Sequence, residues 1–249
     1  MTRFILLAGL ALGLWPAAAE MPEEHRRYFD EDGRLRWVPP PEPTVERLAG
    51  GRIRIADLIV DPRKRSVLVP VAFNARPGEE LEYLLVHELG KVHESLLRTE
   101  TAPTYLHTAM LLLGVERSPK RESSPPAQID REWLGRTDAP SGPAVRLQLL
   151  ASREDGTSGT YALEAFVTDL SRDGPMEEGH WVYNGSALNE GVFVAEVEGS
   201  FASLITDPMA LVNYTGPGRT DDLNWLARAL PDDFPSGDPS LLLRLTLLE

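Results

Sequence analysis

The 249-residue sequence contains no cysteine, and this absence restricts how the chain can be held in a fold. Disulfides, thiolate catalysis, iron–sulfur clusters and cysteine-ligated zinc sites are all excluded. A chain of this length can bury enough apolar surface to fold without such links, as one large domain or two small ones. We therefore expect a fold that depends on its hydrophobic core.

The N-terminus has the layout of a secretory signal peptide. Arg3 provides a positive n-region, residues 4–15 form an apolar run, and the small residues of 16–19 make a cleavage site before Glu20. No later segment approaches the length of a membrane-spanning helix. The sequence therefore predicts a signal peptide at 1–19 and a soluble, exported protein without a transmembrane anchor, located in the periplasm, at the cell surface or outside the cell. The alternative is that residues 4–15 remain as an uncleaved anchor.

The charge of the chain argues against several classes of partner. The formal net charge is −13, and it becomes slightly more negative once the signal peptide and Arg3 are removed. Nucleic acids and anionic membrane surfaces are bound through clustered lysine and arginine, and an acidic field repels them. We expect no nucleic-acid partner, which leaves an unknown protein or a glycan.

Composition divides the chain into an arm, a domain and an inserted loop. Residues 20–44 are charged and Pro-rich, as in an extended arm, and residues 116–142 are a Ser- and Pro-rich loop. Between and beyond them, alternating or β-branched apolar runs predict strands. These runs are 52–55, 66–73, 81–88, 91–97, 145–151, 161–168, 191–198, 201–205 and 241–248.

One clear helix is expected at about residues 102–113. Thr101 is a candidate N-cap, Pro103 lies in the first turn and Gly114 is placed to end the helix. Strands on both sides of a single helix predict the α+β class. The expected fold is one domain over residues 45–249, mainly an antiparallel β-sheet with one packed α-helix and a loop inserted at 116–142.

Three of the five histidines, His87, His93 and His107, fall close together in the sequence and suggest a divalent metal site. His93, Glu94 and His107 are the candidate ligands, because imidazoles and carboxylates bind zinc and similar ions when no thiolate is present. The segment is not an H-E-x-x-H motif, since Leu97 occupies the position of the second histidine. The alternative is structural: His93 and His107 are buried and hydrogen-bonded within the fold.

The pairing of residues 81–88 with 91–97 decides which of these side chains can meet. A tight turn at Leu89-Gly90 predicts an antiparallel hairpin in which His93 shares a face with Lys91 and Ser95, while His87 lies on the other face. A three-residue turn would instead pair His87 with His93. We favour the first register, in which Lys91 and Ser95 complete the candidate cluster.

A second candidate site is aromatic. Trp181 and Tyr183 alternate in a strand-like segment and are a candidate platform for a glycan ring. A half-buried pair in a sheet explains the same pattern.

Two blocks of the sequence resemble the YdjY-type domain of exported bacterial proteins. The first comprises residues 90–97, Pro103, Leu106, His107, Ala109 and 112–114, and the second comprises 181–186, 195–199 and Asp207-Pro208. The resemblance covers most of residues 45–249 but neither the arm nor the loop. It implies export and a shared cluster of Lys91, His93, Glu94, Ser95 and His107, and it brings no known activity, cofactor or catalytic residue.

Taken together, these patterns favour an exported, non-catalytic binding or assembly module. In this hypothesis, the patch of His93, Glu94 and His107 holds the hairpin against the helix. The alternative is a metal-dependent site built on the same three residues, and the sequence leaves open whether the protein is an enzyme.

Overall fold

The computed structural model of the chain describes residues 39–115, 140–189 and 192–248. The predicted signal peptide at 1–19, residues 20–38 of the predicted arm and residues 116–139 of the predicted loop lie outside these ranges. The helices are η1 (Ala49–Gly51), η2 (Val92–Glu94), α3 (Pro103–Leu112), η3 (Leu163–Phe166) and α5 (Val194–Glu198). The strands are β1 (Val45–Arg47), β2 (Ile53–Ile55), β3 (Leu58–Asp61), β4 (Ser66–Phe73), β5 (Tyr83–His87), β6 (Ser95–Thr99), β7 (Ala144–Ser152), β8 (Ser158–Ala162), β9 (Val167–Asp169), β10 (Gly174–Pro175), β11 (Trp181–Tyr183), β12 (Leu188–Asn189), β13 (Val192–Phe193), β14 (Ser200–Ser203), β15 (Val212–Tyr214), β16 (Trp225–Ala227) and β17 (Ser240–Leu247).

The main sheet closes into an eight-stranded β-barrel. Its ring runs β4-β17-β7-β11-β15-β14-β5-β6, and β6 returns to β4 through the pairs Ala72–Arg98 and Phe73–Leu97. The predicted α+β class is therefore wrong, since strands hold 39% of the described residues and helices 14%. Closure pairs β6, which would be an edge strand of an open sheet, with β4, while β1 and β8 remain as edges of the two extensions.

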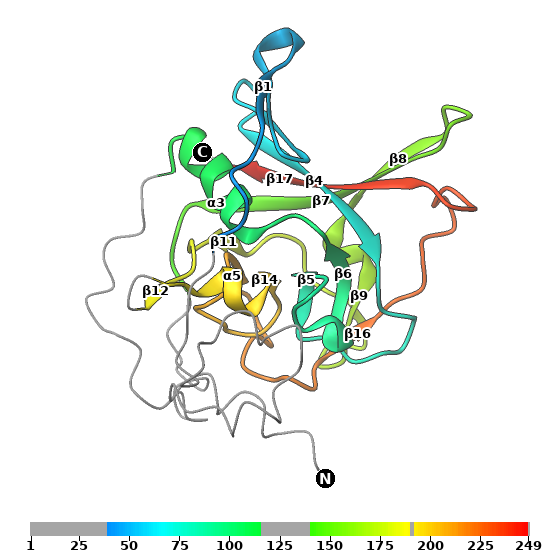
Figure 1. Cartoon of the computed structure of the whole chain (residues 1–249). Coiled ribbons are helices and arrows are strands. Elements are labelled where there is room, and N and C mark those ends of the chain that lie inside the picture. Colours follow the sequence, from blue (N-terminus) through cyan, green and yellow to red (C-terminus); the bar gives the residue numbers. More distant parts are fainter. Residues whose placement is uncertain (1–38, 116–139, 190–191, 249) are drawn as a thin grey trace, which may run out of the picture.

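Two parts of the sheet extend beyond the ring (Figure 1). Strands β1, β2 and β3 continue the antiparallel sheet outward from β4, and β8 extends β7. The long β17, drawn in red, pairs along its whole length with β7 and over residues 241–246 with β4. Its alternating burial explains why the run 241–248 was recognisable as a strand.

The predicted helix is confirmed as α3, with one difference at its start. Pro103 is the first helical residue and Gly114 takes the left-handed conformation just beyond the end, with φ of 84°. The N-cap is Ala102 and not Thr101, whose hydroxyl instead donates a hydrogen bond to Asp57. The helix packs against β3, β4 and α5.

The predicted hairpin at Leu89-Gly90 is wrong. Strands β5 and β6 are parallel, with Tyr83 opposite Ser95 and His87 opposite Thr99. The seven residues 88–94 turn back along β5, with η2 as their last turn. Parallel strands are usually joined by a dozen or more residues, and a short connection with a glycine is typical of an antiparallel hairpin. The short segment around Leu89-Gly90 therefore favoured the wrong pairing.

Two other predicted strands are interrupted by helical turns. Residues 194–198 form α5, which ends at Gly199 in the left-handed conformation. The run 161–168 contains η3 between β8 and β9. Short apolar runs do not distinguish a buried strand from a buried helical turn.

The buried hydrophobic residues form one extended cluster, and the largest fully buried side chains of the described chain are aromatic. These are Trp181, Trp225, Tyr83, Tyr214, Phe166 and Phe201. Within the three described ranges, no helix has the length and apolar character needed to cross a membrane.

Candidate functional site

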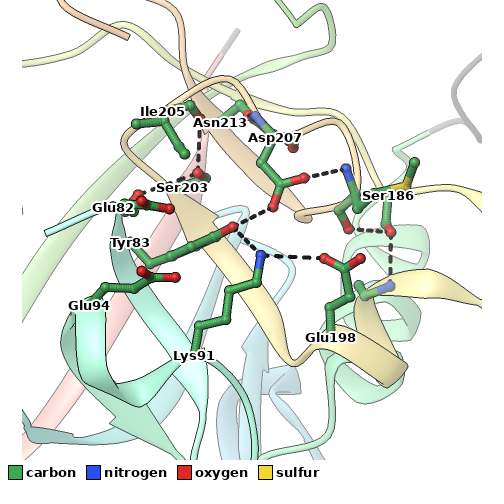
Figure 2. Close-up of polar contacts among 12 residues, drawn as sticks. Glu82, Tyr83, Lys91, Glu94, Ser186, Glu198, Ser203, Ile205, Asp207 and Asn213 are labelled. Atoms are coloured by element: carbon green, nitrogen blue, oxygen red, sulfur yellow. Dashed lines mark hydrogen bonds and ion pairs between the residues drawn. The ribbon is translucent and has the colours of Figure 1, made fainter. Parts of the chain in front are cut away.

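A buried polar network on the barrel wall is the strongest candidate site in the described part of the chain. The Lys91 ammonium donates to the Tyr83 hydroxyl at 2.6 Å, and that hydroxyl donates to Asp207 Oδ2 at 3.0 Å. Glu198 Oε2 lies 3.7 Å from Lys91 Nζ. Figure 2 shows these four side chains converging, and we call them the Lys91 network.

Two short connections between parallel strands supply the network. Residues 88–94 link β5 to β6 and carry Lys91, while residues 204–211 link β14 to the parallel β15 and carry Asp207. Strands β5 and β14 are antiparallel neighbours, so both connections lie over the same part of the wall. The Leu204 amide donates to the Glu82 carbonyl oxygen at 2.9 Å and ties the second connection to the start of β5.

Asp207 is held in place by its own connection and by β15. Its backbone amide donates to Asn213 Oδ1 at 2.8 Å, and its Oδ1 accepts the Met209 amide at 2.9 Å. Asn213 Nδ2 donates back to the Asp207 carbonyl oxygen at 2.7 Å. Both oxygens of the carboxylate therefore have partners inside the protein, one of them Tyr83.

The electrostatics keep Lys91 charged and Tyr83 protonated. Burial lowers the pKa of Lys91, but the neighbouring oxygens of Tyr83, Glu198 and Asp207 outweigh it, so the pKa is raised well above its usual value. Burial, followed by the negative charge of Asp207, raises the pKa of Tyr83 well above 10.0. Neither group is poised near neutral pH as a general base or nucleophile.

Three carboxylates around Lys91 have pKa values displaced toward neutral. Burial raises the pKa of Glu198 to about 7, although Lys91 opposes the shift. Burial and then the charge of Glu94 raise the pKa of Glu82 to about 7. The pKa of Glu94 is also raised, again chiefly by burial. Figure 2 places Glu82 and Glu94 beside Tyr83, on the side away from Glu198.

The candidate metal ligands do not converge. The His93 side chain is 73% exposed, and its Nε2 lies 3.5 Å from Glu94 Oε2. His107 Nδ1 is instead 2.7 Å from the Tyr183 hydroxyl, and its ring packs against Phe193 at 5.0 Å between centroids. Among the residues that the structure describes, no group of three or more His, Asp or Glu side chains is arranged to hold a metal ion.

The other predicted cluster members are also placed apart. His87 accepts the Leu89 amide at Nδ1, and its Nε2 lies 3.2 Å from the Glu100 carbonyl oxygen. Ser95 is buried and donates to the Leu97 carbonyl oxygen at 3.0 Å. Lys91 alone of the predicted cluster belongs to the buried network.

The predicted glycan platform is not on the surface. Trp181 and Tyr183 are 1% and 2% exposed. The Trp181 indole N–H donates to Glu164 Oε1 at 2.7 Å inside the core, and Tyr183 bonds to His107. The alternative, a half-buried pair of side chains in a sheet, is nearer to the structure, in which both rings are fully buried.

Sequence reasoning missed Tyr83, Asp207 and Glu198. Tyr83 was one position of a predicted strand, and the two acids belonged to the second motif block without any role assigned to them. The available signals were the glycines: Gly90 and Gly199 mark the places where the two backbones meet, next to Lys91 and Glu198 respectively.

Comparison with family models, with curated proteins and with solved structures finds no match for this chain. The assignment of a function therefore depends on the geometry described above.

Proposed function

We propose that the chain is an exported, non-catalytic binding or assembly module whose Lys91 network is structural. The donors and acceptors of the network are used internally: Lys91 by Tyr83 and Glu198, and Tyr83 by Asp207. A catalytic lysine or tyrosine needs a lowered pKa, whereas the pKa values of Lys91 and Tyr83 are raised. Burial raises the pKa of Glu198 to about 7, but this side chain is only 9% exposed and lies against Lys91. The network thus connects two loops of the barrel wall.

The observation that carries the binding function is the exposed edge of β1. All three of its residues are exposed, and within the described ranges β1 pairs with β2 alone. An edge strand offers unpaired backbone N–H and C=O groups to an extended segment of a partner. Val45 is 66% exposed at this edge, in a segment of otherwise charged residues, and supplies an apolar contact for such a partner.

Site-specific photo-crosslinking tests this proposal. A photoreactive residue at Val45 should give a discrete adduct in the exported fraction, because this position lies on the edge strand to which a partner strand would add. Leu223 is 65% exposed and serves as the matched control on another surface. Equal labelling at both positions, or none at Val45, contradicts a binding role for the β1 edge.

Export and membership in the YdjY-type family are part of the same proposal. They are supported by the signal-like residues 1–19 and by the two motif blocks in the sequence. N-terminal sequencing of the protein from a fractionated host should begin at Glu20. An intact Met1 in the cytoplasmic fraction would overturn the export part without affecting the crosslinking result.

A further inference from the structure

The outward extension of the sheet is basic, in contrast to the rest of this acidic chain. Residues 45–66 contain six Arg or Lys side chains and three Asp or Glu side chains, whereas the whole chain has a net charge of −13. The basic residues are all exposed: Arg47, Arg52, Arg54, Arg63, Lys64 and Arg65. Such a reversal of local charge attracts an anion that the rest of the surface repels.

Two turns at the same end of this extension flank an open surface hollow. The turn η1 joins β1 to β2, and residues 62–65 join β3 to β4, so both turns lie at the outer end of the antiparallel extension shown at the top of Figure 1. The hollow between them has a volume of about 460 Å³. Its lining residues are Ala49, Gly50, Arg52, Asp61, Arg63 and Lys64.

The cationic groups in the hollow are available to a ligand. Arg52 uses its Nε to bond the Ala49 carbonyl oxygen at 3.3 Å, which leaves its terminal nitrogens for another acceptor. No described residue forms an ion pair with Arg63 or Lys64, while Arg54 nearby is paired with Glu46. The Asp61 carboxylate accepts the backbone amides of Arg63 and Lys64 at 3.1 Å and thereby shapes the turn.

Gly50 opens the hollow to close approach. It has a φ of 76°, and a Cβ built there would meet no atom within 4 Å. A ligand oxygen can therefore approach the turn backbone without a side chain in the way.

We propose that this hollow binds a phosphomonoester group. Arg52, Arg63 and Lys64 against Asp61 leave a local charge of about +2, which matches the charge of about −1.5 to −2 on a phosphomonoester at neutral pH. Guanidinium groups bind phosphate oxygens in a bidentate manner, and a single carboxylate would leave most of these donors unused. The inference rests on the proposed function only because both place ligand or partner binding on the extension formed by β1, β2 and β3.

The test is a titration of the mature protein with inorganic phosphate, measured by isothermal titration calorimetry. The variant Arg52→Gln/Arg63→Gln/Lys64→Gln should weaken binding about tenfold or more, since each cation near a phosphate contributes several-fold in affinity. The matched control Arg76→Gln/Arg146→Gln/Arg228→Gln removes the same charge from exposed arginines elsewhere and should bind as the wild type does. Absence of saturable binding by the wild type, or equal weakening in the control, overturns the proposal.

Two further arms sharpen the result. Lowering the pH from about 7.5 to about 5.5 converts phosphate toward its monoanion and should weaken phosphate binding relative to sulfate, which stays a dianion. Vesicles containing phosphatidic acid, compared with pure phosphatidylcholine vesicles, distinguish a lipid source from a soluble phosphomonoester. Phosphate binding needs no partner protein, so its failure is separate from failure of crosslinking at Val45.

Discussion

Gly90 and Gly199 bring the backbones of two distant segments into direct contact. A Cβ built on Gly199 would lie 3.0 Å from the Gly90 Cα, and one built on Gly90 would lie 2.8 Å from the Glu198 carbonyl oxygen. Because Lys91 and Glu198 are the chain neighbours of these glycines, the close approach sets the ammonium and the carboxylate side by side. Two residues without side chains thus make the Lys91 network possible.

Substitution of Gly90 by alanine should therefore destabilise the protein by about 2 kcal/mol, because backbone atoms would have to move apart. In a domain of this size this corresponds to a fall in the melting temperature of roughly 5 °C, measurable by calorimetry. The matched control is Gly174→Ala, where the nearest atom to the added Cβ is 3.7 Å away and φ is not positive. Similar losses at both positions would contradict the role of the close approach.

Removal of the ammonium should be the most costly change in the network. Lys91→Met leaves Glu198, whose side chain is 9% exposed, without its cation and deprives Tyr83 of a donor. We expect a loss of about 3 kcal/mol in the free energy of unfolding, measured by urea denaturation. Lys64→Met removes an exposed lysine and should change the stability by about 0.5 kcal/mol or less. A Lys91→Met variant as stable as Lys64→Met would refute the structural role.

The stability contribution of Glu82 should depend on pH. Its pKa rises from 4.5 to about 7 on folding, so the side chain is protonated in both states below pH 4.5. Between pH 4.5 and about 7 the carboxyl of Glu82 is ionised in the unfolded chain but still protonated in the folded one. The free energy of unfolding therefore falls as the pH rises through this range. The melting temperature of Glu82→Gln minus that of the wild type should therefore increase from pH 4.5 to about 7 and then level off.

A suitable control for this measurement is Glu80→Gln, in an exposed residue two positions earlier in the chain. Its melting temperature should follow that of the wild type across the same pH range. A flat difference for Glu82→Gln would mean that Glu82 titrates normally in the folded state.

The two histidines of the predicted metal site should differ in their effects. His107→Ala removes the bond to the buried Tyr183 hydroxyl and should cost about 1–3 kcal/mol, whereas His93→Ala changes an exposed side chain and should cost about 0.5 kcal/mol or less. Elemental analysis of protein purified without chelators should give the same metal content for the wild type and the double variant. Stoichiometric metal lost only in the double variant would restore the metal hypothesis.

The strands whose side chains alternate in burial were the predictable part of the fold. Strands β4, β7 and β17 lie within a residue or so of the expected runs, and α3 was predictable from Pro103 and Gly114. Closure of the barrel was not, because it depends on which strands pair over long distances in the chain, such as β4 with β17. The parallel pairing of β5 with β6 was not predicted for the same reason: the local turn signal of Leu89-Gly90 favoured a hairpin, while contacts distant in the chain decide the pairing.

The site was predictable only in part. Lys91 belonged to the expected cluster, but its actual partners come from β5, from α5 and from the connection before β15. A pattern of histidines and acids within one segment cannot show that Asp207 and Glu198, more than a hundred positions away, lie beside it. Proximity in sequence favoured His93, which the fold leaves exposed.

The position of β17 in the ring has a consequence for how the molecule reaches its native state. Strands β4 and β7 both use β17 as a neighbour, yet β17 spans residues 240–247. During synthesis, both strands wait with an open edge until residue 247 has been made. Pairing over such separations is slow and leaves edges exposed to aggregation. The ring can thus close between β4 and β7 only after β17 has been synthesised, far later than the two strands that it joins.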